Sequence, residues 1–177
     1  MRYFIMEQDE KYSDSPNIIN WFGKINVQKL KQGQSWELPD RTLLEIRNNP
    51  DTIFTDVVSK PFLIYSKKTK DAVSIYESGI VHKQIVLLDD KNLMTELYYL
   101  PILKMIDCLS EKSELNTDKS IVRRAVLDKS KLPNRSIFVL DGLSSIYAVV
   151  RLDLAESLLR RGVRGITLRK VEIDEGE

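Results

Sequence analysis

The stretch AVVRLDLAESLLRRGVRGITLRKVEI, residues 148–173, carries the clearest secondary-structure signal in the chain. Its first three residues are small or β-branched and suit a buried strand. The next segment places four apolar residues on one helical face, namely Leu154, Ala155, Leu158 and Leu159. Gly162 follows at the position where a left-handed residue ends a helix. The stretch therefore predicts a strand, a helix, a glycine stop and a second strand.

The second strand of this stretch changes its apolar phase in the middle. Ile166 and Leu168 alternate with polar neighbours, and Val171 and Ile173 do the same one residue out of step. Because side chains alternate between the two faces of a strand, the change of phase at 169–170 predicts a bulge or a bend there.

Residues 62–88 repeat this order of elements. Residues 62–65 form an apolar strand, Ser66 or Thr69 can cap a helix, Gly79 ends it, and residues 80–88 form the next strand. We therefore expect a duplicated strand–helix–Gly–strand unit, with copies at about 62–88 and 148–173. Chance similarity stays open as the alternative, because many α/β segments share this order.

The length of the chain and its many short elements separated by prolines favour a single α+β domain that comprises residues 1–177. Of these 177 residues 42% are hydrophobic, which is enough to build a proper core. Many short elements separated by prolines favour an α+β fold over a helical bundle. We expect a mixed, mostly antiparallel sheet with few helices, in which an N-terminal segment, 1–60, precedes the two units.

The composition excludes several classes of protein. Lys and Arg together number 27 and Asp and Glu 26, so the formal net charge of +1 gives no support to nucleic acid as the main partner. The single cysteine, Cys108, excludes an internal disulfide and fits a reducing compartment. Apolar runs are too short for a signal peptide or a membrane span. We therefore expect a cytoplasmic protein that binds neither nucleic acid nor membrane.

The segment 93–109 is ambiguous between helix and strand. Leu93, Leu97 and Leu100 could form a helical stripe, whereas residues 98–103 favour a strand. Pro101 disfavours both a helix interior and a central strand. We predict a strand, with the proline at an edge or a bulge.

The sequence offers little chemistry. A metal site of the usual kind needs several His or Cys ligands, and the chain has only His82 and Cys108. No nucleophile-elbow motif accompanies His82, and a neighbouring Asp107 would raise the pKa of the Cys108 thiol. Asp89 and Asp90 are expected to be solvated loop ends, with a role as acid and base the less favoured alternative. We therefore predict no enzymatic activity, catalytic residue, metal or cofactor.

Basic residues cluster at two places, and they are the candidates for binding a partner. One cluster contains Arg123 and Arg124, and the other contains Arg160, Arg161 and Arg164. A solvated helix face with cations at its C-terminal end is the favoured explanation of these clusters. The alternative is a basic surface that docks an acidic partner. If there is such an interface, the aromatic candidates for its anchors are Trp21 and Trp36, although most buried tryptophans belong to the core.

Four places in the chain, taken in order, resemble the bacterial immunity-protein family of polymorphic toxin systems, the eleventh immunity class and formerly a domain of unknown function. They are the short strand at 2–5, Asp56 followed by the apolar strand and Ser66, the Tyr-rich stretch from Tyr98 to Asp107, and the closing strand–helix–Gly–strand. The resemblance implies a non-enzymatic antitoxin that binds a cognate toxin and blocks it. It implies no particular contact residue, because such families vary at the contact surface.

Two other functions remain open from the sequence. One is a regulatory or structural module that self-associates, for example as a homodimer, through an exposed sheet edge. The other is a hydrolase that uses carboxylates, which would require a pocket holding two acidic groups.

Overall fold

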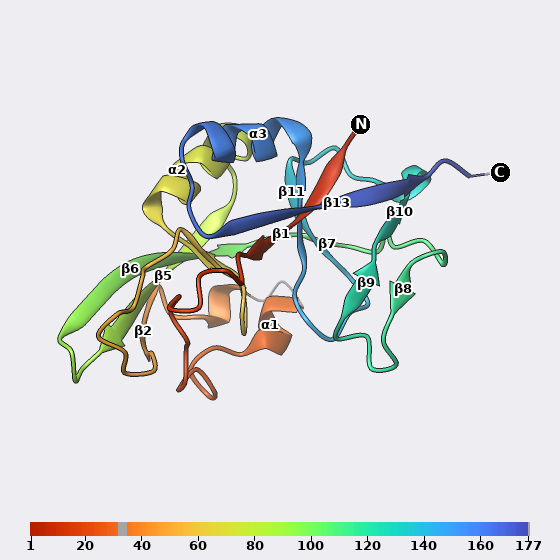
Figure 1. The fold of residues 1–177 in the computed structure, drawn as a ribbon. Helices are drawn as coiled ribbons and strands as arrows, with labels where there is room; N and C mark the ends of the chain where they lie inside the picture. The colour runs from red at the N-terminus through yellow and green to blue at the C-terminus, as the bar shows by residue number, and fades with distance from the viewer. Residues whose placement is uncertain (32–34, 177) are drawn as a thin grey trace.

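The computed structural model describes residues 1–31 and 35–176, and these residues form the α+β fold that the sequence predicts (Figure 1). A six-stranded sheet has the strand order β10-β13-β1-β12-β11-β7, and a five-stranded sheet has the order β2-β5-β6-β4-β3. Strands β8 and β9 form a separate pair. Most strand pairs are antiparallel, whereas β10–β13, β11–β7 and β2–β5 are parallel.

The elements follow one another from the N-terminus with these bounds: β1 (Tyr3–Gln8), α1 (Val27–Lys31), the 3-10 helix η1 (Ser35–Glu37), β2 (Arg41–Glu45), β3 (Val57–Val58), β4 (Ile64–Tyr65), α2 (Lys67–Tyr76), β5 (Val81–Asp89), β6 (Met94–Ile102), β7 (Met105–Ile106), β8 (Glu114–Leu115), β9 (Val122–Arg124), β10 (Val126–Asp128), the 3-10 helix η2 (Lys129–Lys131), β11 (Ile137–Leu140), β12 (Ala148–Arg151), α3 (Leu152–Arg160) and β13 (Ile166–Asp174).

Both expected repeat segments fold as strand, helix and strand. In the first, β4 leads through α2 to β5, and Ser66 caps the helix by accepting a hydrogen bond from the Thr69 amide. In the second, β12 leads through α3 to β13, and Gly162 follows the helix with a φ of +66°. The two helices lie side by side over the sheets (Figure 1).

The two units also share their sheet topology. In the first unit β6 lies between β4 and β5 and is antiparallel to both, so β4 and β5 are parallel to each other. In the second unit β1 lies between β12 and β13 in the same way. Each unit adds an antiparallel strand beside its first strand, β3 or β11, and a parallel strand beside its last, β2 or β10. This match goes beyond local pattern, although common descent of the two units stays a prediction.

The units differ in the origin of the strand that lies in the middle. In the first unit β6 follows β5 directly through a hairpin, whereas in the second unit β1 comes from the other end of the sequence. The register pairs Tyr3 with Val171, so the beginning of β1 lies next to the end of β13. A connection from β13 to β1 would therefore reproduce the hairpin of the first unit.

A circular permutant tests this equivalence. The chain is opened between Glu10 and Lys11, which are both exposed, and residue 177 is joined to residue 1 through two glycines. We expect the permutant to fold with a free energy of unfolding within about 2 kcal/mol of the parent, because the strand pairs are unchanged and the beginning of β1 lies next to the end of β13. Urea unfolding followed by circular dichroism measures this. A permutant without a cooperative transition would contradict the equivalence.

The predicted bulge at 169–170 is wrong. The register of β1 with β13 runs without a shift from Gln8–Ile166 to Tyr3–Val171. The apolar phase changes because both faces of this sheet are covered. Ile166 and Leu168 pack on the apolar cluster beneath α2 and α3, whereas Val171 and Ile173 pack on a second cluster on the opposite face.

The segment 93–109 contains strands, as predicted, with β6 at 94–102 and β7 at 105–106. Strand β6 is central, because β5 and β4 lie on its two sides. However, β4 pairs with β6 at one residue only, Tyr65 with Tyr99. Pro101 lies beyond that pair, where β6 has lost its second neighbour, and a strand tolerates a proline there.

The N-terminal segment covers the outer face of the five-stranded sheet. Ile18, Ile25 and Leu38 pack with Leu44 of β2 and Ile85 of β5 in a third apolar cluster. None of the helices in the described part of the chain has both the length and the apolar character needed to cross a bilayer.

Candidate functional site

Three of the five candidate arginines lie together at the turn between α3 and β13. Arg160 ends α3, Arg161 is its C-cap residue, and Arg164 lies in the loop that follows. All three are exposed. Arg160 is paired with Glu156 on the same helix, and the Arg161 Nε donates to Ser157 Oγ at 3.3 Å. Arg164 forms no ion pair with a residue in the described ranges.

Asp56 fixes the loop that carries these arginines. Its carboxylate accepts hydrogen bonds from the Arg164 backbone amide at 2.7 Å, from Ser66 Oγ at 2.6 Å and from Lys68 Nζ at 3.3 Å. The Asp56 amide in turn donates to the Arg164 carbonyl at 2.9 Å. The buried carboxylate thus joins the start of α2 to the α3–β13 loop and sets the place from which the Arg164 side chain projects.

The hydrogen bonds to Asp56 determine its ionisation. Burial alone would raise the pKa of this carboxyl, but the hydrogen bonds from Ser66, Arg164 and Lys68 outweigh burial and lower the pKa below its ordinary value of 3.8. The ionised Asp56 carboxylate therefore stabilises the folded state fully above pH 3.8. This contribution to the free energy of unfolding is lost as the pH falls through the lower pKa that Asp56 has in the folded state.

The substitution Asp56→Asn tests this junction. At neutral pH we expect it to lower the free energy of unfolding by about 2 kcal/mol, because charge-assisted hydrogen bonds to a buried group are lost. The difference between the two proteins should narrow as the pH falls below 3.8, where the unfolded wild-type chain takes up the proton first. Urea unfolding at a series of pH values measures both effects. A difference that does not change with pH would contradict the assignment.

Close packing of Thr55 against Gly165 holds the same loop. Gly165 has a φ of +72°, and a Cβ atom built on it would lie 2.4 Å from the Thr55 Cβ. The position therefore requires glycine both for its backbone conformation and for the contact. The sequence pattern alone did not reveal this second requirement, because Thr55 is distant in the chain.

The substitutions Gly165→Ala and Gly142→Ala separate the two requirements. Gly142 has a similar φ of +76° but nothing within 4 Å of a built Cβ. We expect Gly142→Ala to cost about 1 kcal/mol for backbone strain and Gly165→Ala to cost at least about 2 kcal/mol, because the clash is added. Guanidinium unfolding gives both values. Equal costs would show that Thr55 can give way without penalty.

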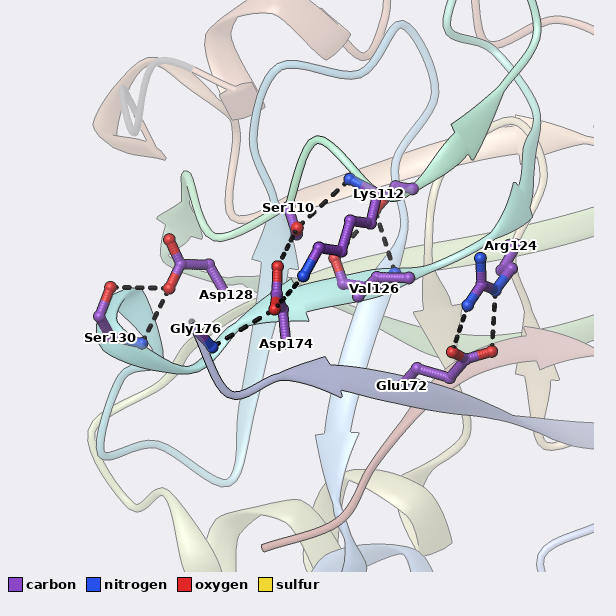
Figure 2. Close-up of polar contacts among 10 residues, drawn as sticks. Ser110, Lys112, Arg124, Val126, Asp128, Ser130, Glu172, Asp174 and Gly176 are labelled. Atoms are coloured by element: carbon purple, nitrogen blue, oxygen red, sulfur yellow. Dashed lines mark hydrogen bonds and ion pairs between the residues drawn. The ribbon is translucent and has the colours of Figure 1, made fainter.

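The other two candidate arginines lie on β9, near the far end of β13. Arg124 binds the Glu172 carboxylate of β13 through two hydrogen bonds, Nε at 2.9 Å and Nη2 at 2.6 Å (Figure 2). Its neighbour Arg123 is exposed and forms no ion pair within the described residues. The two arginine clusters are therefore not one patch. They lie at opposite ends of β13, whose nine residues span about 30 Å.

Polar contacts bind the end of β13 to the segment between β7 and β8 (Figure 2). The carboxylate of Asp174 accepts hydrogen bonds from Ser110 Oγ at 2.7 Å and Lys112 Nζ at 2.8 Å. Strand β10 pairs in parallel with three residues of β13, from Val126–Glu172 to Asp128–Asp174. Hydrogen bonds from Ser110 and Lys112 hold the pKa of Asp174 below its ordinary value, with Lys112 contributing most.

Between the two arginine clusters β13 has no strand on one side. Strand β1 pairs along residues 166–171 on the other side, and within the described part of the chain no strand pairs with these residues on the β10 side. We call residues 166–171 of β13 the open edge. The open edge carries Lys170, which is exposed and forms no ion pair with a described residue.

A groove of about 940 Å³ lies against the face of β13 at the same place. Arg169 lies in this groove and donates to the Glu7 carboxylate at 2.9 Å and to the Val122 carbonyl at 2.8 Å. The groove also contains Lys60 and Tyr147. Open edge, groove and flanking arginines together form the candidate interaction surface.

The two tryptophans do not join this surface. Trp21 is half-buried against the cluster of the five-stranded sheet, with its ring 6.1 Å from that of Phe62. Trp36 lies in η1, which contacts α1, and is 75% exposed. Trp21 thus serves the core, and Trp36 is a solvent-facing residue of the N-terminal segment.

The titratable residues considered for catalysis are dispersed. Burial lowers the pKa of His82 to about 4, and its Nε2 lies 2.7 Å from the Tyr65 hydroxyl. Burial raises the pKa of the Cys108 thiol to about 12. Asp90 and Asp107 are exposed, but the expectation of a solvated Asp89 is wrong. The buried Asp89 carboxylate accepts hydrogen bonds from the Asn49 amide and from Asn92, which closes the β5–β6 hairpin.

Within residues 1–31 and 35–176 no three His, Cys, Asp or Glu side chains converge as metal ligands would. A scan against protein-family models finds no match to this sequence, and a search of curated proteins finds none either.

Proposed function

We propose that this protein is an immunity protein, which binds a cognate bacterial toxin and neutralises it by occupying part of its surface. The observation that carries the proposal is the open edge of β13 between two groups of exposed cations. A sheet edge offers backbone hydrogen bonds to a partner, and the flanking charges select an acidic one. The resemblance of four segments to the immunity-protein family points to the same role.

The basic residues of this surface have two different roles, attraction of the partner and stabilisation of the fold. Arg123, Arg164 and Lys170 form no ion pair within the described residues, so their fields act on an approaching partner. Arg124 is bound to Glu172 and supports β9 rather than the partner. No bond is made or broken in this mechanism, and the protein would act in the cytoplasm of the cell that makes the toxin.

Self-association is the second candidate, and the same open edge favours it. Two copies could pair through their uncovered strands and form a homodimer. Lys170 opposes this arrangement, because a cation on a sheet edge is a common defence against edge-to-edge pairing. Sedimentation of the isolated protein decides between a monomer and a dimer.

Co-expression with the toxin encoded beside the gene tests the proposal. We expect the wild-type protein to protect cells and to co-purify with an inactivated form of that toxin. The variants Arg123→Glu and Arg164→Glu should each lower the association rate by about tenfold at low salt, because the steering field is reversed. Surface plasmon resonance measures the rate, and the effect should disappear near about 0.5 M salt.

Lys91→Glu is the matched control, since Lys91 is an exposed lysine in the β5–β6 hairpin, on the other sheet. Loss of protection by the wild-type protein itself would reject the immunity function. An equal effect of Lys91→Glu would show that only net charge matters and not this surface.

A further inference from the structure

We propose that the open edge of β13 accepts an extended segment of the partner as an additional strand, parallel to β13, with the local pattern apolar–x–acidic. The identity of the partner as a toxin depends on the function proposed above, whereas the mode of binding depends only on the geometry of the edge.

The parallel strand beside the last strand is longer in the first unit of this protein than in the second. Strands β5 and β13 are equivalent and have nine residues each. In the first unit β2 pairs in parallel with five residues of β5, 84–88, which leaves four residues, 81–83 and Asp89, without a strand on that side. In the second unit β10 pairs with three residues of β13, 172–174, which leaves six. In the first unit the fold therefore already holds a parallel strand at the place that corresponds to residues 169–171 of the open edge.

The backbone of the open edge points toward the vacant side at alternate residues. The Glu172 amide donates to the Ala125 carbonyl on the β10 side at 3.1 Å. Because peptide groups alternate along a strand, the amides of Lys170 and Leu168 face the same side. Neither amide donates a hydrogen bond on that side to a residue of the described chain. An added parallel strand would supply the missing acceptors, as β2 does for β5.

Side chains on the edge determine the chemistry of the segment. Leu168 and Lys170 lie two residues apart and therefore on one face of the strand. Leu168 is half-buried against the cluster beneath the helices, so an apolar side chain beside it would extend that cluster. An acidic side chain two residues later would lie beside Lys170. Arg164 lies before the edge, and the Arg123 carbonyl lies 3.5 Å from Arg169 Nη1, beside the later part of the edge, so both cations favour further acidic residues in the segment.

The variant Lys170→Pro tests the backbone contact directly. Proline removes the amide hydrogen on the open side, which donates to no residue of the described ranges, so the pairing of β13 with β1 should remain. Lys170→Ala is the matched control, because it removes the same charge and keeps the amide. The probe is a synthetic ten-residue peptide, blocked at both ends, in which threonine alternates with valine and glutamate in turn. A second peptide carries lysine in place of glutamate.

The peptides are titrated into the nitrogen-15-labelled protein. We expect the glutamate peptide to shift the amide resonances of Leu168 and Lys170, and we expect Lys170→Pro to bind it about tenfold more weakly than Lys170→Ala does. The lysine peptide should bind the wild-type protein about tenfold more weakly than the glutamate peptide, a result that does not depend on how well the proline variant folds. No shift on β13, or equal binding by both variants, would overturn the proposal. Dimerisation of Lys170→Ala in the absence of peptide would also overturn the proposal, because the role of Lys170 would then be to prevent pairing between two copies of this edge.

Binding experiments with the inactivated toxin distinguish failure of the strand-addition proposal from failure of the proposed immunity function. If the toxin binds the wild-type protein and Lys170→Pro equally well, strand addition is wrong and the immunity function stands. If the toxin fails to bind the wild-type protein while the glutamate peptide binds at the edge, the immunity function is wrong and the binding mode stands.

Discussion

The backbone of one central strand in each unit is the constraint on which the rest of the structure depends. In each unit the strand–helix–strand crossover places its two strands parallel with a gap of one strand between them, so a third strand must supply hydrogen bonds to both. Strand β6 does this in the first unit, and β1 does it in the second, pairing with β12 along residues 3–6 and with β13 along residues 3–8. The outer strands then differ in how much of their length pairs with a second neighbouring strand, and this determines where each sheet has an uncovered edge.

The local parts of the fold could be predicted from the sequence, because their signals lie within a few residues. The cap at Ser66, the stop at Gly162 and the strand character of 94–102 are of this kind. Pairing between distant strands leaves no such signal, and the wrong bulge on β13 shows why. A strand between one covered and one open face alternates cleanly, whereas β13 packs Leu168 on one cluster and Val171 on another. The change of apolar phase at 169–170 thus arises from apolar clusters on both faces of the strand and not from a bulge.

The candidate site was predictable only in its charges. The sequence indicated the five arginines, but their adjacency in the chain suggested patches, whereas the fold places Arg164 and Arg123 toward opposite ends of one strand. The open edge could not be predicted, since it exists through the shortness of β10, and strand length at a sheet edge depends on contacts that are remote in sequence. The prediction that Trp21 and Trp36 anchor a partner at this surface is not supported by their positions in the fold. Trp21 is a core residue of the other sheet, and only the packing against Phe62 reveals this.

The protein holds the edge open through specific contacts. After the Ala125 carbonyl has bonded to Glu172, the chain that leads back into β9 could continue along β13 and cover it. Instead the Arg169 guanidinium, which lies on the face of the sheet, binds the Val122 carbonyl, and the Tyr147 hydroxyl accepts from the Val122 amide and donates to the Ser120 carbonyl. These bonds satisfy the backbone of β9 on the face of the sheet, so β9 has less to gain from pairing at the edge. Because Glu7 of β1 binds the same guanidinium, the central strand that completes the unit also fixes the side chain that keeps its outer strand uncovered.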